Sequence, residues 1–120
     1  MRRPIKLSPS HRELQVMSVL WRHEDASVAT VQAELNAHWE PDVAYTTVLT
    51  YLRSLIAKGW VSAETSERAY RYVPVVSRHH ARAWAVTELL DLYYDGSREA
   101  LLRDLRTRRF PFGPARSAAE

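Results

Sequence analysis

Residues 45–59 of this chain read YTTVLTYLRSLIAKG, and this stretch decides the fold. Its large apolar residues recur with the period of one stripe on an α-helix, at Val48, Leu52, Leu55 and Ile56. The spacing predicts a helix with one face in a core and the other face exposed. Gly59 follows Lys58 and predicts the end of the helix, because glycine readily adopts the left-handed conformation found at helix ends.

The exposed face of this predicted helix has an unusual composition. It carries Thr46, Thr47, Thr50 and Arg53. No acidic residue occurs across residues 44–63, whereas an ordinary solvated helix face mixes both signs of charge. Threonine is a mediocre helix former, but it can hydrogen-bond a phosphate or a base edge, and its methyl group can contact the methyl group of thymine. The pattern favours a surface that contacts DNA; the alternative is an ordinary helix surface that happens to hold β-branched residues.

A two-stranded hairpin is predicted directly after this helix. Its strands span residues 60–64 and 69–73, and tyrosines alternate with other residues in the second strand, which is typical of a half-buried strand. A hairpin in this place is the wing of a winged helix. Arg68 at the tip and Arg71 on the strand could lie near a phosphate backbone. Alternatively, they are charges on a solvated hairpin edge, where charge discourages aggregation.

Two further helices are predicted upstream. Ser10 and Glu13 have the spacing of a capping box at the start of the first helix, and Ser27 can cap a second helix that runs to about residue 37. Their inward-facing residues are predicted to be Leu14, Met17, Leu20 and Trp21 in the first helix, and Val28, Val31 and Leu35 in the second. Asp42 is a plausible cap for the third helix. This order of elements is that of a helix-turn-helix with a wing, whose second motif helix enters the major groove of DNA.

The same residues carry a resemblance to a known family. They are Ser10, Glu13, Val16, Met17, Leu20, Trp21, Tyr45, Thr46, Thr47, Val48, Thr50, Leu52, Leu55, Lys58, Gly59, Tyr72, Pro74, Gly96 and Ser97. In identity and spacing they resemble the penicillinase-repressor family, which comprises small bacterial repressors of the BlaI and MecI type. The resemblance covers about residues 10–106. The whole string is more specific than a winged helix alone, which would fit many families of regulators.

The resemblance implies a homodimeric transcriptional repressor that binds a dyad operator in double-stranded DNA. In better-known members, a membrane-bound sensor with a zinc protease domain relieves repression by leading to cleavage of an Asn-Phe bond in the repressor. Asp104 and Leu105 occupy the matching positions here, so a sensor protease is suggested only by the resemblance and its route does not carry over. The cysteine-rich tail of the copper-responsive branch is also absent, since the chain has no cysteine.

The second half of the chain predicts a helical arm. Ser77 and Ser97 can each cap a helix, the first running to about Tyr94 and the second to about Arg106. Because the winged helix is complete without these helices, their apolar surface favours dimerisation; the alternative is that they fold back on their own chain. The predicted interface residues are Trp84, Leu89, Leu92, Leu101 and Leu105. The proline-containing residues 109–120 are expected to form a flexible tail.

Composition limits the classes of protein that this chain can be. Its 120 residues, 46% hydrophobic and 26% charged, suffice for one folded core, and a net charge of +3 is only a mild basic bias. No long apolar run and no secretory signal are expected, which favours a cytoplasmic, nucleoid-associated protein. Three glycines leave no phosphate-binding loop, and the five histidines show no metal-ligand spacing. We therefore expect no enzyme activity, no metal and no cofactor.

The sequence thus predicts a mainly α-helical winged helix-turn-helix at residues 1–75, a dimerisation arm at residues 76–108 and a tail at residues 109–120. The predicted base contacts are Thr47, Thr50 and Arg53. The predicted DNA-backbone contacts are Thr46, Lys58, Arg68 and Arg71. The predicted function is sequence-specific DNA binding by a repressor that blocks a promoter. The alternative is a winged-helix module for protein interaction, which should show acids or a large apolar patch on the third helix.

Overall fold

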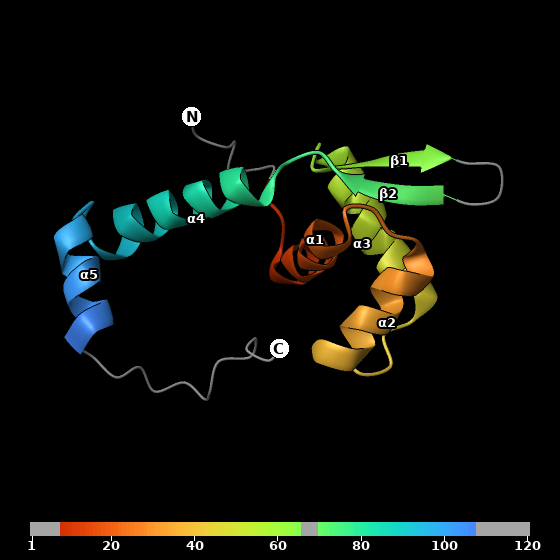
Figure 1. The fold of residues 1–120 in the computed structure, drawn as a ribbon, viewed down its shortest axis with the longest axis horizontal. Coiled ribbons are helices and arrows are strands. Elements are labelled where there is room, and N and C mark those ends of the chain that lie inside the picture. The colour runs from red at the N-terminus through yellow and green to blue at the C-terminus, as the bar shows by residue number, and fades with distance from the viewer. Residues whose placement is uncertain (1–7, 66–69, 108–120) are drawn as a thin grey trace. The chain divides into compact units, whose positions relative to one another are not determined.

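The computed structural model describes residues 8–65 and 70–107 and contains five helices and a two-stranded sheet in this range (Figure 1). The elements are α1 (His11–His23), α2 (Val28–His38), α3 (Tyr45–Ala57), β1 (Val61–Thr65), β2 (Tyr70–Pro74), α4 (Arg78–Tyr93) and α5 (Arg98–Thr107). The order confirms the predicted winged helix-turn-helix with two helices after the wing. The predicted tail and the hairpin tip with Arg68 lie outside the described residues.

Serine side chains begin four of the five helices, as the sequence predicted. The capping box of α1 is complete, because the Ser10 hydroxyl accepts from the Glu13 N–H at 3.1 Å and Glu13 accepts from the Ser10 N–H at 2.9 Å. The hydroxyls of Ser27, Ser77 and Ser97 each accept from the N–H three residues later, at the starts of α2, α4 and α5. These caps satisfy backbone donors that the helix itself leaves without a partner.

The start of α3 differs from the prediction. Ala44, not Asp42, is the N-cap residue, and no side chain caps the helix. Asp42 lies two residues too early, in a left-handed turn conformation with φ of 63°. Asp42 therefore serves as a turn residue, for which aspartate is also well suited, and does not cap the helix.

The end of α3 follows the prediction for Gly59, which has φ of +82°. The Gly59 N–H donates to Ile56 O at 3.0 Å, and the Trp60 N–H donates to Leu55 O at 2.9 Å. These two bonds form the Schellman motif, in which a left-handed residue closes the helix. The motif turns the chain directly into the wing and leaves Trp60 buried at its base.

The core of the winged helix lies between α1, α2, α3 and the hairpin. Its fully buried side chains are Val16, Met17, Val19, Leu20, Val31, Leu35, Val48, Leu52 and Leu55. The predicted burial was wrong for two residues, since Leu14 is 38% exposed and Ile56 is 37% exposed. Each lies at the border of its helix stripe, where no packed neighbour covers it fully. Trp21 is only partly buried, and its indole N–H donates to Val76 O at 2.8 Å.

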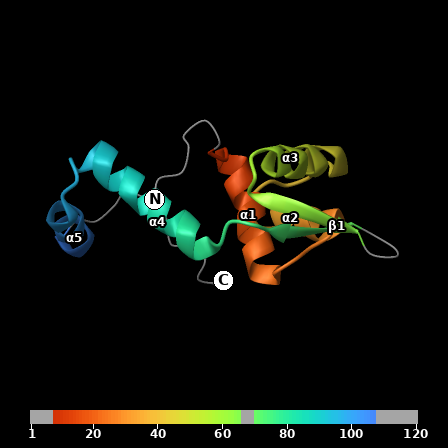
Figure 2. The ribbon, with the colours of Figure 1, turned by 90° about the horizontal axis from the view of Figure 1, so that it is seen from above.

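The wing is tied to the helices by a backbone bridge that the sequence did not predict. Ala26, in the connection between α1 and α2, exchanges hydrogen bonds of 3.1 and 2.8 Å with Tyr72 of β2. Strands β1 and β2 pair antiparallel, with Ala63 opposite Tyr72. The bridge gives β2 a backbone partner on each side, so the base of the wing is held to the helical core. Figure 2 shows the hairpin beside α1 and α3.

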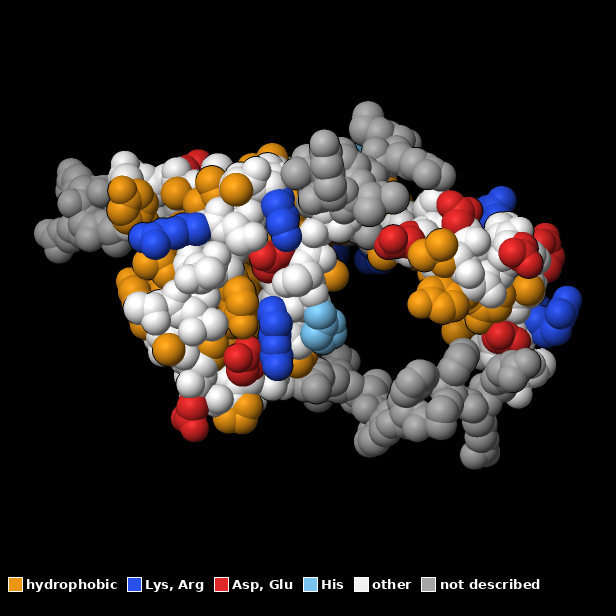
Figure 3. All heavy atoms as spheres, turned by 180° about the vertical axis from the view of Figure 1, so that it is seen from behind, with side chains coloured by type: hydrophobic (Ala, Val, Ile, Leu, Met, Phe, Trp, Pro, Cys, Tyr) orange, Lys and Arg blue, Asp and Glu red, His pale blue; other side chains and the backbone are white. Residues whose placement is uncertain are grey.

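The described residues fall into two compact units that divide between Trp84 and Ala85, within α4. In the second unit, Tyr94 donates to Asp104 at 2.9 Å and links the helices across their turn. Apolar side chains are exposed on this unit at Val86, Leu89, Leu92, Tyr93, Leu102 and Leu105 (Figure 3). Leu102 and Leu105 are exposed in the single chain, because two short helices cannot cover their own apolar faces.

Trp84 has a different environment from the exposed leucines of the arm. Its ring meets Trp60 edge to face at 5.7 Å between centroids and stacks on His80 at 6.2 Å. Trp84 packs against the core of the first unit and is partly buried there. The contact gives Trp84 a packing partner in its own chain, and its place in a dimer interface stays a prediction.

Trp84→Ala should therefore destabilise the winged unit. Replacing a fully buried tryptophan costs about 3–5 kcal/mol, and the partly exposed Trp84 should cost roughly 2 kcal/mol. Urea unfolding monitored by circular dichroism measures the change, and sedimentation of the folded variant measures assembly. Unchanged stability together with a raised monomer fraction would place Trp84 in the interface that the sequence predicted.

Candidate nucleic-acid interface

The outer face of α3 presents the side chains that the sequence assigned to DNA. Thr46, Thr50 and Arg53 are exposed, and Thr47 is partly buried beside the core residue Val48. The Thr50 hydroxyl donates to Thr46 O at 3.0 Å, one helical turn earlier. Its hydrogen is thus occupied, and Thr50 presents a methyl group and oxygen lone pairs to the outside.

The first turn of α3 has no side-chain cap, and its N-cap residue is Ala44. Early N–H groups of a helix need partners from outside the helix, and the positive end of the helix dipole favours an anion there. Thr46 is exposed in this turn and adds a hydroxyl. The N–H groups of this turn and the Thr46 hydroxyl can therefore donate hydrogen bonds to a phosphate oxygen, the contact that was predicted for Thr46.

The helix face continues into the wing through an aromatic group. Burial raises the pKa of Tyr72 above its ordinary value of 10.0, and the nearby Tyr45 and Tyr70 raise it further, while the charge of Arg53 lowers it. Arg53 on α3 is thus close enough to Tyr72 on β2 to affect its titration. Tyr45 and Tyr70 are about half exposed, and the Tyr70 ring lies 6.4 Å from the Tyr72 ring. Sequence reasoning had not assigned these tyrosines to the site.

Two basic residues predicted to contact the DNA backbone have partners within the protein. Lys58 Nζ lies 2.6 Å from Glu13 Oε1 and 3.2 Å from Ser8 O. Arg71 lies 2.6 Å from Asp25 Oδ1 in a half-exposed ion pair. A phosphate contact of Lys58 would remove the partner of a buried carboxylate.

Glu13 is an unusual carboxylate because only 6% of its surface is exposed. Burial alone would raise its pKa, but hydrogen bonds from Lys58, Ser54 and the Ser10 N–H, together with the charge of Lys58, hold the pKa below the ordinary value of 4.5. The carboxylate thus joins the first turn of α1 to the last turn of α3.

Glu13→Gln should lower the free energy of unfolding at neutral pH by about 2 kcal/mol, because charge-assisted hydrogen bonds are lost. A carboxyl group with a lowered folded-state pKa stabilises the fold above its unfolded pKa and loses this effect as the pH falls through the folded value. The difference between wild type and variant should therefore shrink below about pH 4.5. Urea unfolding at several pH values tests this, and an equal difference at all pH values would contradict it.

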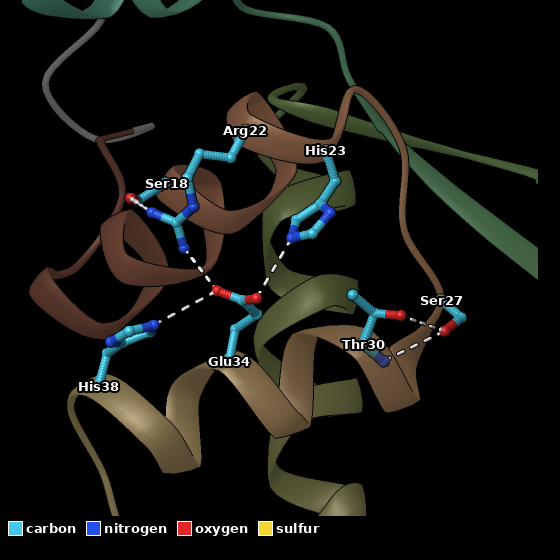
Figure 4. Close-up of polar contacts among 7 residues, drawn as sticks. All are labelled: Ser18, Arg22, His23, Ser27, Thr30, Glu34 and His38. Carbon is cyan, nitrogen blue, oxygen red and sulfur yellow. Dashed lines mark hydrogen bonds and ion pairs between the residues drawn. The ribbon is translucent and has the colours of Figure 1, made fainter. Parts of the chain in front are cut away.

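A second polar cluster joins α1 to α2. Arg22 donates to Glu34 at 2.7 Å, and the imidazoles of His23 and His38 lie 3.4 and 3.7 Å from the same carboxylate (Figure 4). Burial would raise the pKa of Glu34, but its hydrogen bonds with Arg22 and His23 and their charges lower it. His23 and His38, to which the sequence assigned no function, thus lie around the ion pair of Arg22 and Glu34.

The segment before α3 is held by two side chains that sequence reasoning missed. Asn36 Oδ1 accepts from the Val43 N–H at 2.7 Å, and Gln32 Nε2 donates to Val43 O at 3.0 Å. Both amides project from α2, the first helix of the motif. The only signal in the sequence was their spacing of one helical turn, which is too common to be informative.

The described residues offer little support for other kinds of site. No three His, Asp or Glu side chains in residues 8–65 and 70–107 gather closely enough to hold a metal ion. In the same part of the chain, no helix is both long and apolar enough to cross a membrane.

Comparison with known proteins matches residues 9–114 to the model of the penicillinase repressor family. Over 92 residues the chain is 40% identical to "Transcriptional regulator BlaI" from two strains of Mycobacterium tuberculosis, which covers 75% of this chain and 65% of that protein. It is 27% identical over 95 residues to "Penicillinase repressor" from Bacillus licheniformis, covering 78% of this chain and 71% of that protein. The chain therefore spans less than two thirds of the length of the mycobacterial relatives.

Proposed function

This chain belongs to the penicillinase repressor family, and from that premise we propose that it is a sequence-specific DNA-binding repressor that acts as a homodimer. The observation that carries the proposal is the outer face of α3, where Thr46, Thr50 and Arg53 are exposed and no acid interrupts residues 44–63. A helix with this face, in the second position of a helix-turn-helix, suits the major groove. An acidic or broadly apolar face, as expected for a protein-interaction module, is absent from the described part of α3.

In the proposed complex, Thr47, Thr50 and Arg53 contact base edges, and Thr46 with the uncapped first turn of α3 contacts a phosphate. Arg is suited to guanine, and the Thr50 methyl group is suited to thymine. Arg71 contacts the backbone only if it leaves Asp25, an exchange that costs little for a half-exposed pair.

The proposed dimer forms through the exposed apolar faces of the second unit. Leu89, Leu92 and Leu105 are exposed there, and Leu101 is partly buried beside them. A second copy would cover these faces and place two α3 helices in successive major grooves, roughly 34 Å apart. Bound across a promoter, such a dimer blocks polymerase sterically.

Cleavage at Asp104–Leu105 is not part of the proposal. The bond lies inside α5, and the Asp104 carboxylate accepts a hydrogen bond of 2.9 Å from the Tyr94 hydroxyl. A protease would have to unfold this turn before the bond could enter an active site.

Selection of genomic DNA fragments by the purified full chain tests the proposal. Bound fragments are sequenced, and the enriched sequence is titrated at two salt concentrations against a scrambled duplex. We expect enrichment of a sequence with dyad symmetry and an affinity for it about 10³-fold or more above that for the scrambled duplex. Equal retention of all fragments would show that the chain is not a sequence-specific repressor.

A further inference from the structure

Helix α3 is held at its two ends by polar contacts of different origin. We call the contacts of Glu13 with Lys58 and Ser54 the C-terminal clamp. We call the contacts of Gln32 and Asn36 with Val43 the N-terminal clamp. Between them, α3 touches the core through Val48, Leu52 and Leu55, which are fully buried.

Apolar contacts hold α3 against the core but do not fix its orientation tightly. The hydrophobic effect is non-directional, so a stripe of Val and Leu side chains tolerates small rotations and shifts of the helix. Hydrogen bonds weaken steeply when their geometry changes, especially where a carboxylate or ammonium group is involved. The two clamps are directional contacts of this kind, and a shift of α3 would weaken them.

The C-terminal clamp has the burial and the charge that this task requires. Glu13 is fixed by its own capping box in α1, and Lys58 Nζ lies 2.6 Å from its Oε1. Ser54 adds a hydroxyl donor from α3 itself. Ser54 directly follows Arg53 in α3, and Lys58 is the C-cap residue of the helix, so the clamp holds the end of α3 that carries Arg53. Figure 2 shows the start of α1 beside the end of α3.

The N-terminal clamp acts on a peptide unit and not on a side chain. Both backbone groups of Val43 bond to α2, at 2.7 and 3.0 Å, and the Val43 side chain is buried. Two residues later α3 begins without a capping side chain of its own. The position of its first turn, with Thr46 and Thr47, therefore depends on Asn36 and Gln32.

We propose that Glu13 and Asn36 are positioning residues for DNA readout, which set the orientation of α3 without touching DNA. This inference rests on the proposed function, because it takes the outer face of α3 as the DNA-reading surface. It adds that the two clamps control the sequence selectivity of that surface. It also assigns Lys58 to the C-terminal clamp and not to a phosphate contact.

The first test measures selectivity, defined as the ratio of affinities for the selected operator and the scrambled duplex. Glu13→Gln and Asn36→Ala should each lower this ratio by about tenfold, comparable to losing one base contact, with little change in affinity for the scrambled duplex. Glu34→Gln is the matched control, since it removes a carboxylate whose partners Arg22, His23 and His38 lie on α1 and α2. It should leave the ratio unchanged under conditions where all variants are folded.

Lys58→Met separates positioning from phosphate binding. A lost phosphate contact weakens binding to both duplexes and reduces the salt slope by about 1, whereas a lost positioning contact lowers selectivity with the slope unchanged. The double variant Glu13→Gln/Lys58→Met should lose no more selectivity than either single variant, because both remove one clamp. A reduced slope, or additive losses, would overturn this part of the inference.

Amide hydrogen exchange tests the clamps without DNA. Glu13→Gln should speed exchange in the last turn of α3, and Asn36→Ala in its first turn, while Glu34→Gln should affect neither. Unchanged exchange in α3 would overturn the clamps, and altered exchange with wild-type selectivity would overturn the positioning of readout. A wild-type chain that enriches no sequence would overturn the proposed function itself, even where exchange shows that the clamps exist.

Discussion

Leu92→Glu should convert the protein to a monomer and lower its affinity for a dyad operator on the order of a hundredfold, because joining two reading heads raises avidity by about 10²–10⁴. Leu92 is 68% exposed in the single chain, and Leu89 lies one turn earlier on the same helix. A glutamate buried in a dimer interface would lack a partner, and the cost of burying its charge would separate the subunits.

Val75→Glu is the matched control for this change. Val75 is 61% exposed but lies in the first unit, after β2, so the same substitution there should leave the dimer and its operator affinity intact. Sedimentation at several concentrations and operator titration measure the two effects. A Leu92→Glu variant that remains dimeric, together with a dimeric Leu105→Glu variant, would show that the subunits associate elsewhere.

Much of the fold could be predicted from local signals. Four serine caps and the Gly59 terminus involve residues within a few positions of one another, so their spacing in the sequence states the contact directly. The apolar stripe of α3 was equally readable, apart from Ile56 at its border. Asp42 failed because its left-handed backbone conformation is set by the turn as a whole and not by its capping preference.

The contacts that distinguish the site from the rest of the fold are long-range and could not be predicted. Lys58 was predicted to contact a phosphate, and the fold places it at Glu13, 45 positions earlier. Trp84 was predicted to lie in a dimer interface, and the fold places its ring against Trp60. Lys58 can pair with a phosphate or with a carboxylate, and Trp84 can pack on a second copy or on its own chain. The sequence alone does not show which partner the fold brings close.

Arg53→Ala should weaken operator binding by about 1–3 kcal/mol, the usual worth of an arginine that contacts guanine. Arg53 is exposed on α3, and its positive charge lowers the pKa of Tyr72 on β2 against the effect of burial. Affinity for a scrambled duplex should fall much less. Arg12→Ala is the control, because Arg12 is similarly exposed but pairs with Glu40 at 3.3 Å in the first unit.

Thr50 allows the chemistry of readout to be resolved further. Its hydroxyl hydrogen is occupied by Thr46 O at 3.0 Å, which leaves a methyl group and an acceptor oxygen for DNA. If the methyl group contacts thymine, Thr50→Val should retain operator affinity and Thr50→Ser should lose about 1 kcal/mol or more. We expect Thr50→Val to retain affinity and Thr50→Ser to lose it, because the Thr50 hydroxyl already donates its hydrogen to Thr46 O.

The selected operator supplies an independent check on the same contact. Replacing one thymine of each half-site by uracil removes only the C5 methyl group, so it should weaken wild-type binding and leave Thr50→Ser unaffected. The loss should occur at one thymine position and should match the loss caused by Thr50→Ser. If Thr50→Val loses as much affinity as Thr50→Ala, the acceptor oxygen and not the methyl group contacts DNA. If all three variants bind like wild type while Arg53→Ala does not, α3 reads DNA through its C-terminal half, and the threonine face was misassigned.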